Sequence, residues 1–331
     1  MRRIFNYNIH GILKINSDSP IFIPNYFLTS AKYDEPDVII RSEMSVKIPK
    51  TGITQIMPDL FLCERSKVVI SKVKILGIPV AWSLKNLWRK PIEVIVSKNY
   101  EILSKTLLKM PISTTFPIHA YIQHILHIGL LRKDHTFLVG GCVEASNKDF
   151  AIVLSSMGGM GKSTITLKIL KEAKGKFLGD DMIIVNRLGT IYAYPKPIRW
   201  RRLIISPLSI ESYLSPLKVL KSRAQIKEKS KVGAVCLLER GSRNELKSIE
   251  PEEAITKLLI IVRKALPYYM ERTILAYSYM DNSLSLYKIM QKETEILQSF
   301  LAHANCYILK YKDRDIAWCV RSLIRIADEC I

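Results

Sequence analysis

The architecture of this chain is indicated most clearly by one stretch, Phe150-Ala-Ile-Val-Leu-Ser-Ser-Met-Gly-Gly-Met-Gly-Lys-Ser-Thr164. It begins with five apolar or small residues, Phe150 to Leu154, which suit a buried strand. The turn Gly158-Gly159-Met160-Gly161 then lets the backbone curl so that successive N–H groups converge on an anion. Residues 164–170 continue with helical spacing, so a helix N-terminus faces the same point. The stretch therefore predicts a strand, a phosphate-binding loop and a helix, in that order.

The loop nearly matches the pattern G-x-x-x-x-G-K-[ST] of nucleoside triphosphate sites. Lys162 supplies a mobile charge for the β- and γ-phosphates, and Ser163 places a hydroxyl where Mg²⁺ binds. Ser156 stands where the pattern has its first glycine, and serine can make this turn if its φ stays negative. The alternative is a glycine-rich turn with no ligand. The nucleotide, ATP, is expected to be bound by Ser156, Met157, Gly158, Gly159, Met160, Gly161, Lys162, Ser163 and Thr164.

The composition is that of an ordinary globular protein. The chain has 331 residues, enough for one large domain or two smaller ones, of which 48% are hydrophobic and 24% charged. The basic start Met1-Arg2-Arg3 leads into polar residues rather than the apolar segment of a signal peptide. Six scattered cysteines without Cys-x-x-Cys spacing favour reduced thiols over a zinc site or a disulfide framework. These features predict a cytoplasmic protein with no membrane association.

The charge balance is strongly basic. Fifty Lys and Arg residues against 30 Asp and Glu residues give a formal net charge of +20. Such a charge attracts polyanions at long range, and nucleic acid is the commonest polyanion in a cell. The alternative is a general bias toward lysine that has no functional meaning.

The first 110 residues are rich in short strand patterns. Strands are predicted at 3–15, 37–40, 60–63, 68–75 and 92–96, followed by a helix at 101–110. Pro111 and Pro117 then interrupt the chain. We therefore predict a β-rich N-terminal domain over 1–110, which is a candidate for substrate binding, and a second domain over 111–331.

The second domain alternates helices and strands around the glycine-rich loop. Further strands are predicted at 137–139, 142–145, 176–185 and 232–238, and helices at 118–131, 251–264, 293–304 and 315–327. This order predicts an α/β core that carries C-terminal helices. The helix 118–131 contains His119, His124 and His127. A metal pair is conceivable for the last two, but packing or surface roles are favoured because the helix has no acidic or Cys partner.

Two acids follow the loop by about one helix length. Asp180 and Asp181 lie in the predicted strand 176–185. A carboxylate at the end of a neighbouring strand is where nucleotide-binding proteins of this kind hold Mg²⁺. One acid could hold the metal while the other accepts a proton from an attacking hydroxyl. The alternative is a polar turn.

Together these segments resemble a known family. Ser155 to Thr164, Phe177-Leu-Gly-Asp-Asp-Met182 and Tyr192-Ala-Tyr-Pro195 look like the HPr kinase/phosphorylase group of P-loop kinases, which is related to phosphoenolpyruvate carboxykinase. Val232 to Gly241, a strand that ends in Arg-Gly, also resembles that group. The resemblance covers residues 118 to 260. It implies an HPr kinase-like P-loop core with a smaller β-rich N-terminal domain, and a kinase that uses ATP and Mg²⁺.

The resemblance also assigns roles to residues. Asp180 would deprotonate the acceptor hydroxyl, Asp181 and Ser163 would hold Mg²⁺, and Lys162 would neutralise charge on the transferred phosphoryl group. One departure from the family concerns a histidine on the strand before the loop. Here that strand reads Val139-Gly140-Gly141-Cys142, and His135 lies too far upstream to replace the histidine. The resemblance therefore supports a kinase and leaves reverse phosphorolysis open.

A basic segment follows the acids. Residues 196–231 contain ten basic residues and two acids. Within it Arg199-Trp200-Arg201-Arg202 places an aromatic ring among guanidinium groups, a mixture suited to phosphate contacts and base stacking. Residues 85–90, which include Trp88 and Arg89, repeat this mixture. The alternative is a solvated basic face with buried tryptophans. The expected substrate-binding residues are Arg199, Trp200, Arg201, Arg202 and Arg240.

The identity of the acceptor stays open between classes. The first hypothesis is an RNA kinase that phosphorylates a nucleoside hydroxyl, because a basic HPr kinase-like protein looks like the archaeal tRNA kinases that modify a ribose 2′-hydroxyl. The second is a protein or peptide serine kinase whose basic surface binds an acidic partner. The third, a nucleotide-gated binding module without catalysis, is disfavoured by the acid pair beside the loop.

Overall fold

A computed structural model gives the structure of the chain. It describes residues 3–20, 23–49, 51–107, 120–144, 149–172, 175–196, 198–203, 209–214, 226–281, 285–312 and 315–329. Contacts divide the chain into two compact units. The N-terminal unit comprises Met1–Lys133, Arg201–Ser212 and Leu266–Met290, and the C-terminal unit comprises the rest. The predicted boundary at residues 110 and 111, with Pro111 and Pro117, lies outside the described residues, so the proposed division stays a prediction.

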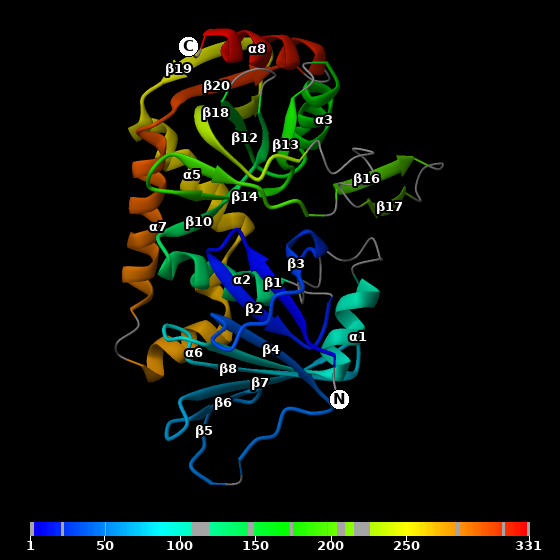
Figure 1. The fold of residues 1–331 in the computed structure, drawn as a ribbon, viewed down its shortest axis with the longest axis vertical. Helices are drawn as coiled ribbons and strands as arrows, with labels where there is room; N and C mark the ends of the chain where they lie inside the picture. Colours follow the sequence, from blue (N-terminus) through cyan, green and yellow to red (C-terminus); the bar gives the residue numbers. More distant parts are fainter. Residues whose placement is uncertain are drawn as a thin grey trace. The chain divides into compact units, whose positions relative to one another are not determined.

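The N-terminal unit contains a mixed nine-stranded sheet with the strand order β3-β1-β2-β4-β9-β8-β7-β6-β5 (Figure 1). Neighbours pair antiparallel except β2 with β4 and β4 with β9, which are parallel. The strands are β1 (Phe5–Ile9), β2 (Leu13–Ser17), β3 (Leu28–Thr29), β4 (Val38–Glu43), β5 (Thr54–Met57), β6 (Leu60–Cys63), β7 (Val68–Ile75), β8 (Ile78–Lys85) and β9 (Ile92–Ser97).

The single strand predicted over residues 3–15 is wrong, because the segment folds into the hairpin of β1 and β2. His10 and Gly11 have φ of 52° and 75°, which turns the chain between the two strands. The Asn8 side chain stabilises this turn by accepting a hydrogen bond from the Gly11 N–H at 2.6 Å. The alternation of apolar and polar residues runs through the turn, which is why the sequence pattern shows one strand.

The helices of the N-terminal unit are α1 (Lys98–Leu107), α2 (Ala120–Arg132) and α6 (Arg272–Met280). Residues 108–110 of the predicted helix 101–110, and His119, lie outside the described residues. His124 and His127 are buried in α2, and the His127 ring packs edge-on against Tyr268 at 4.9 Å. Burial, and secondarily the nearby His124, lowers the pKa of His127 to about 3. No group of three metal-ligating side chains occurs among the described residues. Burial of His124 and His127 and the ring contact of His127 favour the packing interpretation for these two residues.

The C-terminal unit is built on a second mixed sheet, with the path β10-β14-β15-β18-β12-β11-β13 and with β20 and β19 added beside β18. The fold is thus mixed α/β with two large mixed sheets, as the α/β prediction requires. The strands are β10 (His135–Val139), β11 (Gly141–Glu144), β12 (Phe150–Ser155), β13 (Lys176–Gly179), β14 (Met182–Asn186), β15 (Thr190–Tyr192), β18 (Lys229–Arg240), β19 (Glu245–Ile249) and β20 (Asn305–Tyr311).

Two bends shape this second sheet. β10 continues into β11 across Gly140, and β13 continues into β14 across Asp180 and Asp181. The two ends of the sheet path, β10 and β13, each belong to one of these bent segments. The two bent segments also pair with each other, β10 with β14 and β11 with β13. The sheet therefore closes on itself. The continuous strand predicted over 176–185 is wrong because the chain bends tightly there: a Cβ on Gly179 would lie 2.5 Å from the Met182 carbonyl oxygen.

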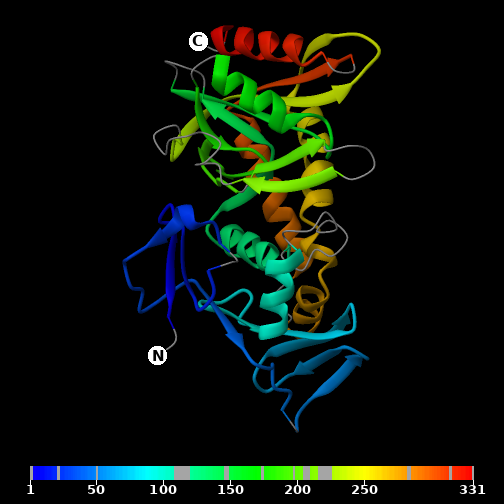
Figure 2. The same ribbon diagram turned by 90° about the vertical axis from the view of Figure 1, so that its right-hand side faces the viewer.

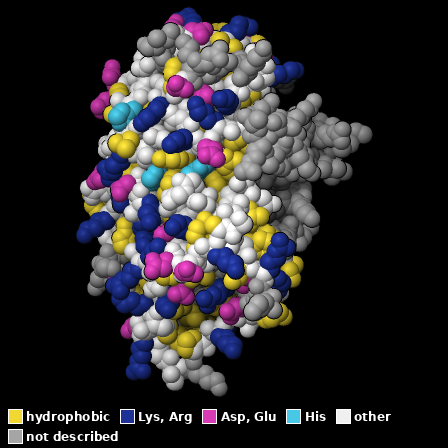
Figure 3. Space-filling model, in the orientation of Figure 1, with side chains coloured by type: hydrophobic (Ala, Val, Ile, Leu, Met, Phe, Trp, Pro, Cys, Tyr) yellow, Lys and Arg dark blue, Asp and Glu magenta, His cyan; other side chains and the backbone are white. Residues whose placement is uncertain are grey.

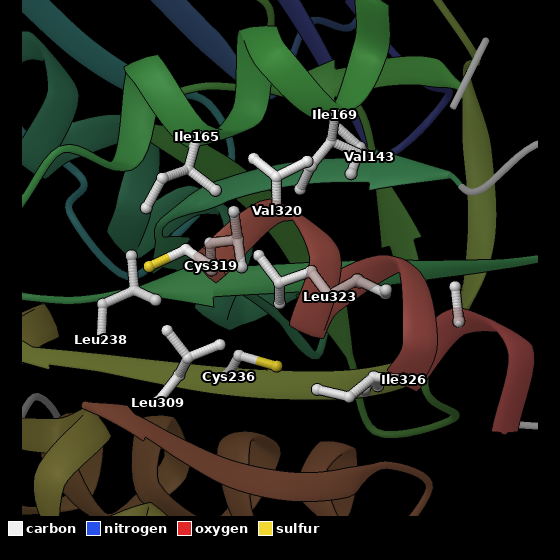
Figure 4. Packing of buried hydrophobic residues seen from close by; sticks show 14 of the residues in the cluster. Val143, Ile165, Ile169, Cys236, Leu238, Leu309, Cys319, Val320, Leu323 and Ile326 are labelled. Atoms are coloured by element: carbon white, nitrogen blue, oxygen red, sulfur yellow. The ribbon is translucent and has the colours of Figure 1, made fainter. Parts of the chain in front are cut away.

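Two helices cover one face of this sheet: α3 (Lys162–Glu172), green in Figure 2, and α8 (Ile316–Glu329), red in Figure 2. Figure 4 shows Ile165 and Ile169 of α3 and Val320 and Leu323 of α8 gathered over the buried strands. Each of these four side chains is at most 2% exposed. Burying one such side chain stabilises the fold by about 1.5–3 kcal/mol, so α3 is firmly anchored by this core.

The remaining C-terminal helices are α5 (Pro251–Ala265) and α7 (Leu286–Leu301). The helices predicted at 251–264, 293–304 and 315–327 are confirmed, although α7 begins seven residues earlier and ends three residues earlier. The strand β20 that follows α7 was not predicted. It lies between β18 and β19, where it pairs parallel with β18. Within the described residues no helix is both long and apolar enough to cross a membrane.

Candidate functional site

The glycine-rich loop joins β12 to α3, as the sequence predicts. Gly159 and Gly161 have φ of 82° and 78°, in the left-handed region that glycine adopts without strain. A Cβ on Gly158 or on Gly159 would meet no atom within 4 Å, so these positions border open space rather than packed protein. The first helical hydrogen bond of α3 runs from the Ile165 N–H to the Gly161 carbonyl at 3.0 Å. The loop therefore leads directly into a helix N-terminus with room for a ligand.

Lys162 places its ammonium group across the start of the loop. Its Nζ donates to the carbonyl oxygens of Ser156 at 2.9 Å and Met157 at 3.2 Å, and to the Ser156 hydroxyl at 3.2 Å. Burial lowers the pKa of this ammonium group, while the charges of Asp181 and Asp180 raise it. These hydrogen bonds hold the ammonium group beside the loop. In a phosphate complex, phosphate oxygens would replace these oxygens as its partners.

Close backbone packing brings the two acids beside the loop. The Ser155 hydroxyl at the end of β12 donates to the Val139 carbonyl at 2.6 Å, and the Gly140 N–H donates to the Asp181 carbonyl at 3.1 Å. A Cβ on Gly141 would lie only 2.2 Å from the Thr166 hydroxyl of α3. Gly140 and Gly141, at the bend between β10 and β11, thus let the bend at Asp180 and Asp181 and the helix α3 approach each other.

Asp180 is the buried member of the acid pair. Its residue is 6% exposed, and its Oδ1 has no hydrogen-bond partner within the described structure. Burial raises the pKa of the Asp180 carboxyl to about 6, and the Asp181 charge also raises it, whereas a hydrogen bond from Ser163 and the charge of Lys162 lower it. A carboxylate with such a pKa is suited to accept a proton near neutral pH.

Asp181 is the exposed member. Its side chain is 65% exposed, and its Oδ2 lies 3.6 Å from Nζ of Lys196. Neighbouring residues of an extended chain point in opposite directions, and here the result is one carboxylate inside the site and one at its margin.

The donor set fits Mg²⁺ bound together with a nucleotide. In phosphate-transferring sites Mg²⁺ takes one or two carboxylates, a hydroxyl, phosphate oxygens and water. The buried Oδ1 of Asp180 and the hydroxyl of Ser163, which hydrogen-bonds to Asp180, supply oxygens of this kind. Asp181 adds a carboxylate next in the chain.

The last residues of β18 and β20 both contact the glycine-rich loop. Arg240, the last residue of β18, donates from Nη2 to the Gly159 carbonyl at 3.3 Å. Tyr311, the last residue of β20, donates its hydroxyl hydrogen to the Met160 carbonyl. The predicted role of Arg240 in binding the acceptor stays a prediction; in the structure its side chain contacts the glycine-rich loop. Tyr311 was not predicted, although the apolar run Cys306 to Leu309 before it is a strand pattern that could have been found.

The other expected substrate residues lie on a separate two-stranded sheet. Arg199, Trp200, Arg201 and Arg202 belong to β16 (Ile198–Leu203), which pairs with β17 (Ser209–Leu214). The side chains of these two strands lie outside the described residues, as do Lys218, Lys221 and Arg223 of the basic segment. Their roles stay predictions.

Several other basic residues have structural partners. Lys196 lies beside Asp181, Lys227 pairs with the buried Glu144, and Lys231 donates to the Leu188 carbonyl. In the segment 85–90, Lys85 lies 3.8 Å from Glu93, and Lys90 lies 3.8 Å from Asp37. On the face shown in Figure 3, described Lys and Arg side chains are scattered among acidic ones. Part of the positive charge therefore serves the fold.

His135 lies at the far end of β10 from the acids. It pairs with Asn186, whereas Val139 pairs with Met182, the residue after the acid pair. The four intervening steps correspond to about 13 Å along a strand. The His135 ring packs against Tyr192 at 5.4 Å instead. His135 therefore lies apart from the acid pair along the strand.

Comparisons with known proteins add little. No family model matches the sequence, and no curated protein matches it either. Among solved structures, the chain is similar to the Hpr(Ser) kinase/phosphatase from Coxiella burnetii, with 9% identity over 57% of this chain and 94% of that chain. The TM-score of this match is 0.29. A likeness this slight carries no argument about fold or activity.

Proposed function

We propose that the chain is an ATP-dependent kinase that transfers the γ-phosphoryl group to a hydroxyl. The observation that carries the proposal is the buried Asp180 carboxyl, with a pKa of about 6, beside Ser163 and Lys162 at the end of a glycine-rich loop. A loop of this kind binds phosphates, and a carboxylate of this kind takes a proton. Their combination is what phosphoryl transfer to a hydroxyl requires.

In the proposed reaction the loop amides and Lys162 bind the β- and γ-phosphates of ATP. Asp180 accepts the proton of the acceptor hydroxyl, the hydroxyl oxygen bonds to the γ-phosphorus, and the bond between this phosphorus and the bridging oxygen breaks to release ADP. Ser163 and Asp181, with Asp180 beside them, would hold Mg²⁺, which would supply neutralising charge for the phosphate oxygens. Lys162 stabilises the charge that develops on the bridging oxygen.

The acceptor that we propose is RNA, with a tRNA ribose 2′-hydroxyl as the specific target. The formal charge of +20 and the ten basic residues of segment 196–231 support a polyanionic acceptor. Arg199, Trp200, Arg201 and Arg202 are suited to hold the backbone and an unpaired base. An acidic protein with an acceptor serine is the alternative that the test must exclude.

The experiment is transfer of label from ATP carrying a labelled γ-phosphate. The purified protein is given total tRNA or lysate protein, and we expect label in tRNA only. Asp180→Asn should lower the transfer rate by about 10²–10⁴-fold, the usual contribution of a general base. The matched control is Asp149→Asn, which removes an exposed carboxyl of the same unit at the start of β12 and should transfer at the normal rate.

Labelling of protein but not tRNA would replace the RNA acceptor with a protein acceptor. No transfer to either substrate, together with unchanged ATP turnover in Asp180→Asn, would overturn the kinase proposal itself.

A further inference from the structure

Two consecutive carbonyl groups of the glycine-rich loop are held by neighbouring strand ends. β18 and β20 are parallel, and Arg240 stands opposite Tyr311 in their register. Arg240 donates to the Gly159 carbonyl, and the Tyr311 hydroxyl donates to the Met160 carbonyl. These contacts fix the orientation of the two peptide groups that join residues 159 to 161.

Fixing a carbonyl also fixes the amide of the next residue. A peptide group is planar and trans, so its C=O and N–H point in opposite directions. The Gly159 and Met160 carbonyls point at the strand ends, so the N–H groups of Met160 and Gly161 point away from them. These amides belong to the segment whose N–H groups contact phosphate in loops of this pattern.

An anchor is needed here because glycine permits the opposite orientation. The peptide between Met160 and Gly161 can rotate if φ of Gly161 changes sign, and glycine populates both signs of φ about equally. Gly161 has a φ of 78°, and a Cβ on it would lie 3.5 Å from the Tyr311 hydroxyl. The hydrogen bond from Tyr311 therefore selects one of two accessible loop conformations.

Tyr311 is itself rigidly placed. It is 3% exposed and belongs to the core between the sheet, α3 and α8. Directly after it, the Lys312 N–H donates to the Asn244 side chain at 2.8 Å, and Asn244 donates to Asp315 at 2.7 Å. Asp315 in turn accepts from the Trp318 N–H at 3.1 Å, which caps α8. By contrast, Arg240 is exposed.

We propose that Tyr311 is a positioning residue for the nucleotide phosphates: its hydroxyl holds the peptide between Met160 and Gly161 so that the Gly161 N–H faces the β-phosphate. Arg240 supports the preceding peptide in the same way, from an exposed side chain. The inference rests on the proposed function, because it assumes that the loop binds a nucleotide.

The test is Tyr311→Phe, which keeps the ring in the core and removes the hydroxyl. We expect the dissociation constants of Mg-ADP and of pyrophosphate to rise roughly three- to tenfold, the effect of losing one hydrogen bond. AMP, which has no β-phosphate, should bind unchanged. The KM for ATP should rise by a similar factor with kcat nearly unchanged, because the amide binds ground state and transition state alike.

The matched control is Tyr307→Phe, which removes a hydroxyl four residues earlier on the same strand, from a ring that packs against the same core. It should leave the affinities for ADP, pyrophosphate and AMP unchanged. Arg240→Gln should weaken ADP binding less than Tyr311→Phe, because its bond is solvent-exposed.

Unchanged ADP and pyrophosphate affinity in Tyr311→Phe would overturn the inference. An affinity loss of equal size for AMP would also overturn it, because general destabilisation would then explain the loss. If the unaltered protein binds neither ADP nor pyrophosphate, the proposed function fails, which is a different result from failure of the Tyr311 role.

Discussion

At the scale of single residues, the acid pair shows how two identical side chains come to differ in burial. Asp180 and Asp181 are adjacent, yet one residue is buried and the other side chain is mostly exposed. The pKa of the Asp180 carboxyl is raised, because burial disfavours its charged form and the Asp181 charge adds repulsion. This difference gives two adjacent carboxyls different environments, one buried beside the glycine-rich loop and one exposed to solvent.

Removal of the Asp180 charge should stabilise the protein at neutral pH. A pKa raised from 3.8 to about 6 means that the ionised carboxylate costs the folded state roughly 1–3 kcal/mol. The protonated carboxyl contributes stability below about pH 4, and this contribution is lost as pH rises through 6. Asp180→Asn should therefore have a higher midpoint of urea unfolding than the unaltered protein at pH 7.5. The gap should shrink toward pH 4, and Asp149→Asn should show no such gap.

The same pKa should appear in the pH dependence of catalysis. Asp180 must be ionised to accept a proton, so kcat/KM should fall tenfold per pH unit below about pH 6 and be flat above it. Initial rates of phosphoryl transfer between pH 4.5 and 8 would measure this profile. The same pH profile in the residual activity of Asp180→Asn would exclude Asp180 as the base.

At the scale of elements, the bends in the second sheet position the site. Gly140 and Gly141 lie where β10 passes into β11, and Gly179 precedes the acids where β13 passes into β14. Each of these glycines has another atom within 2.6 Å of where a Cβ would stand. The acids therefore reach the loop because the strands bend and pack without side chains between them.

Gly141→Ala should test this close approach. The added Cβ would lie 2.2 Å from the Thr166 hydroxyl, which is buried and has no hydrogen-bond partner within the described structure. We expect a loss of about 1–3 kcal/mol in the free energy of unfolding, the usual cost of overpacking. The double variant Gly141→Ala/Thr166→Ala should recover part of this loss in urea unfolding. Gly158→Ala, at a position bordered by open space, should leave stability unchanged; equal losses in both glycine variants would contradict the packing argument.

At the scale of the whole molecule, net charge is the property that bears on the partner. The charge of +20 is large, although several Lys side chains are paired with acids within the fold. Pairing within the fold leaves the net charge unchanged, and the long-range field depends on that net charge. The field therefore favours a polyanionic partner.

Salt dependence should reveal the nature of this partner. If RNA is bound through several phosphates, log K for tRNA should fall with log salt with a slope of about −3 or steeper. Arg201→Gln should make this slope shallower by about 1, because it removes one phosphate contact. The control is Arg325→Gln, which removes an exposed arginine that pairs with Glu329 on α8 and should leave the slope unchanged. A slope near zero in fluorescence titrations would contradict the RNA proposal.

The amino-acid sequence by itself determined the strand, glycine-rich loop and helix at residues 150–172 and the presence of an acid pair after them. These are local features, because glycine spacing and apolar periodicity act within a few residues. Only the tertiary structure decided that Asp180 is buried and Asp181 exposed, and that Tyr311 contacts Met160 across 151 positions of the chain. Both depend on which strands bend and pair, and parallel pairing such as that of β18 with β20 leaves no short-range signal in the sequence.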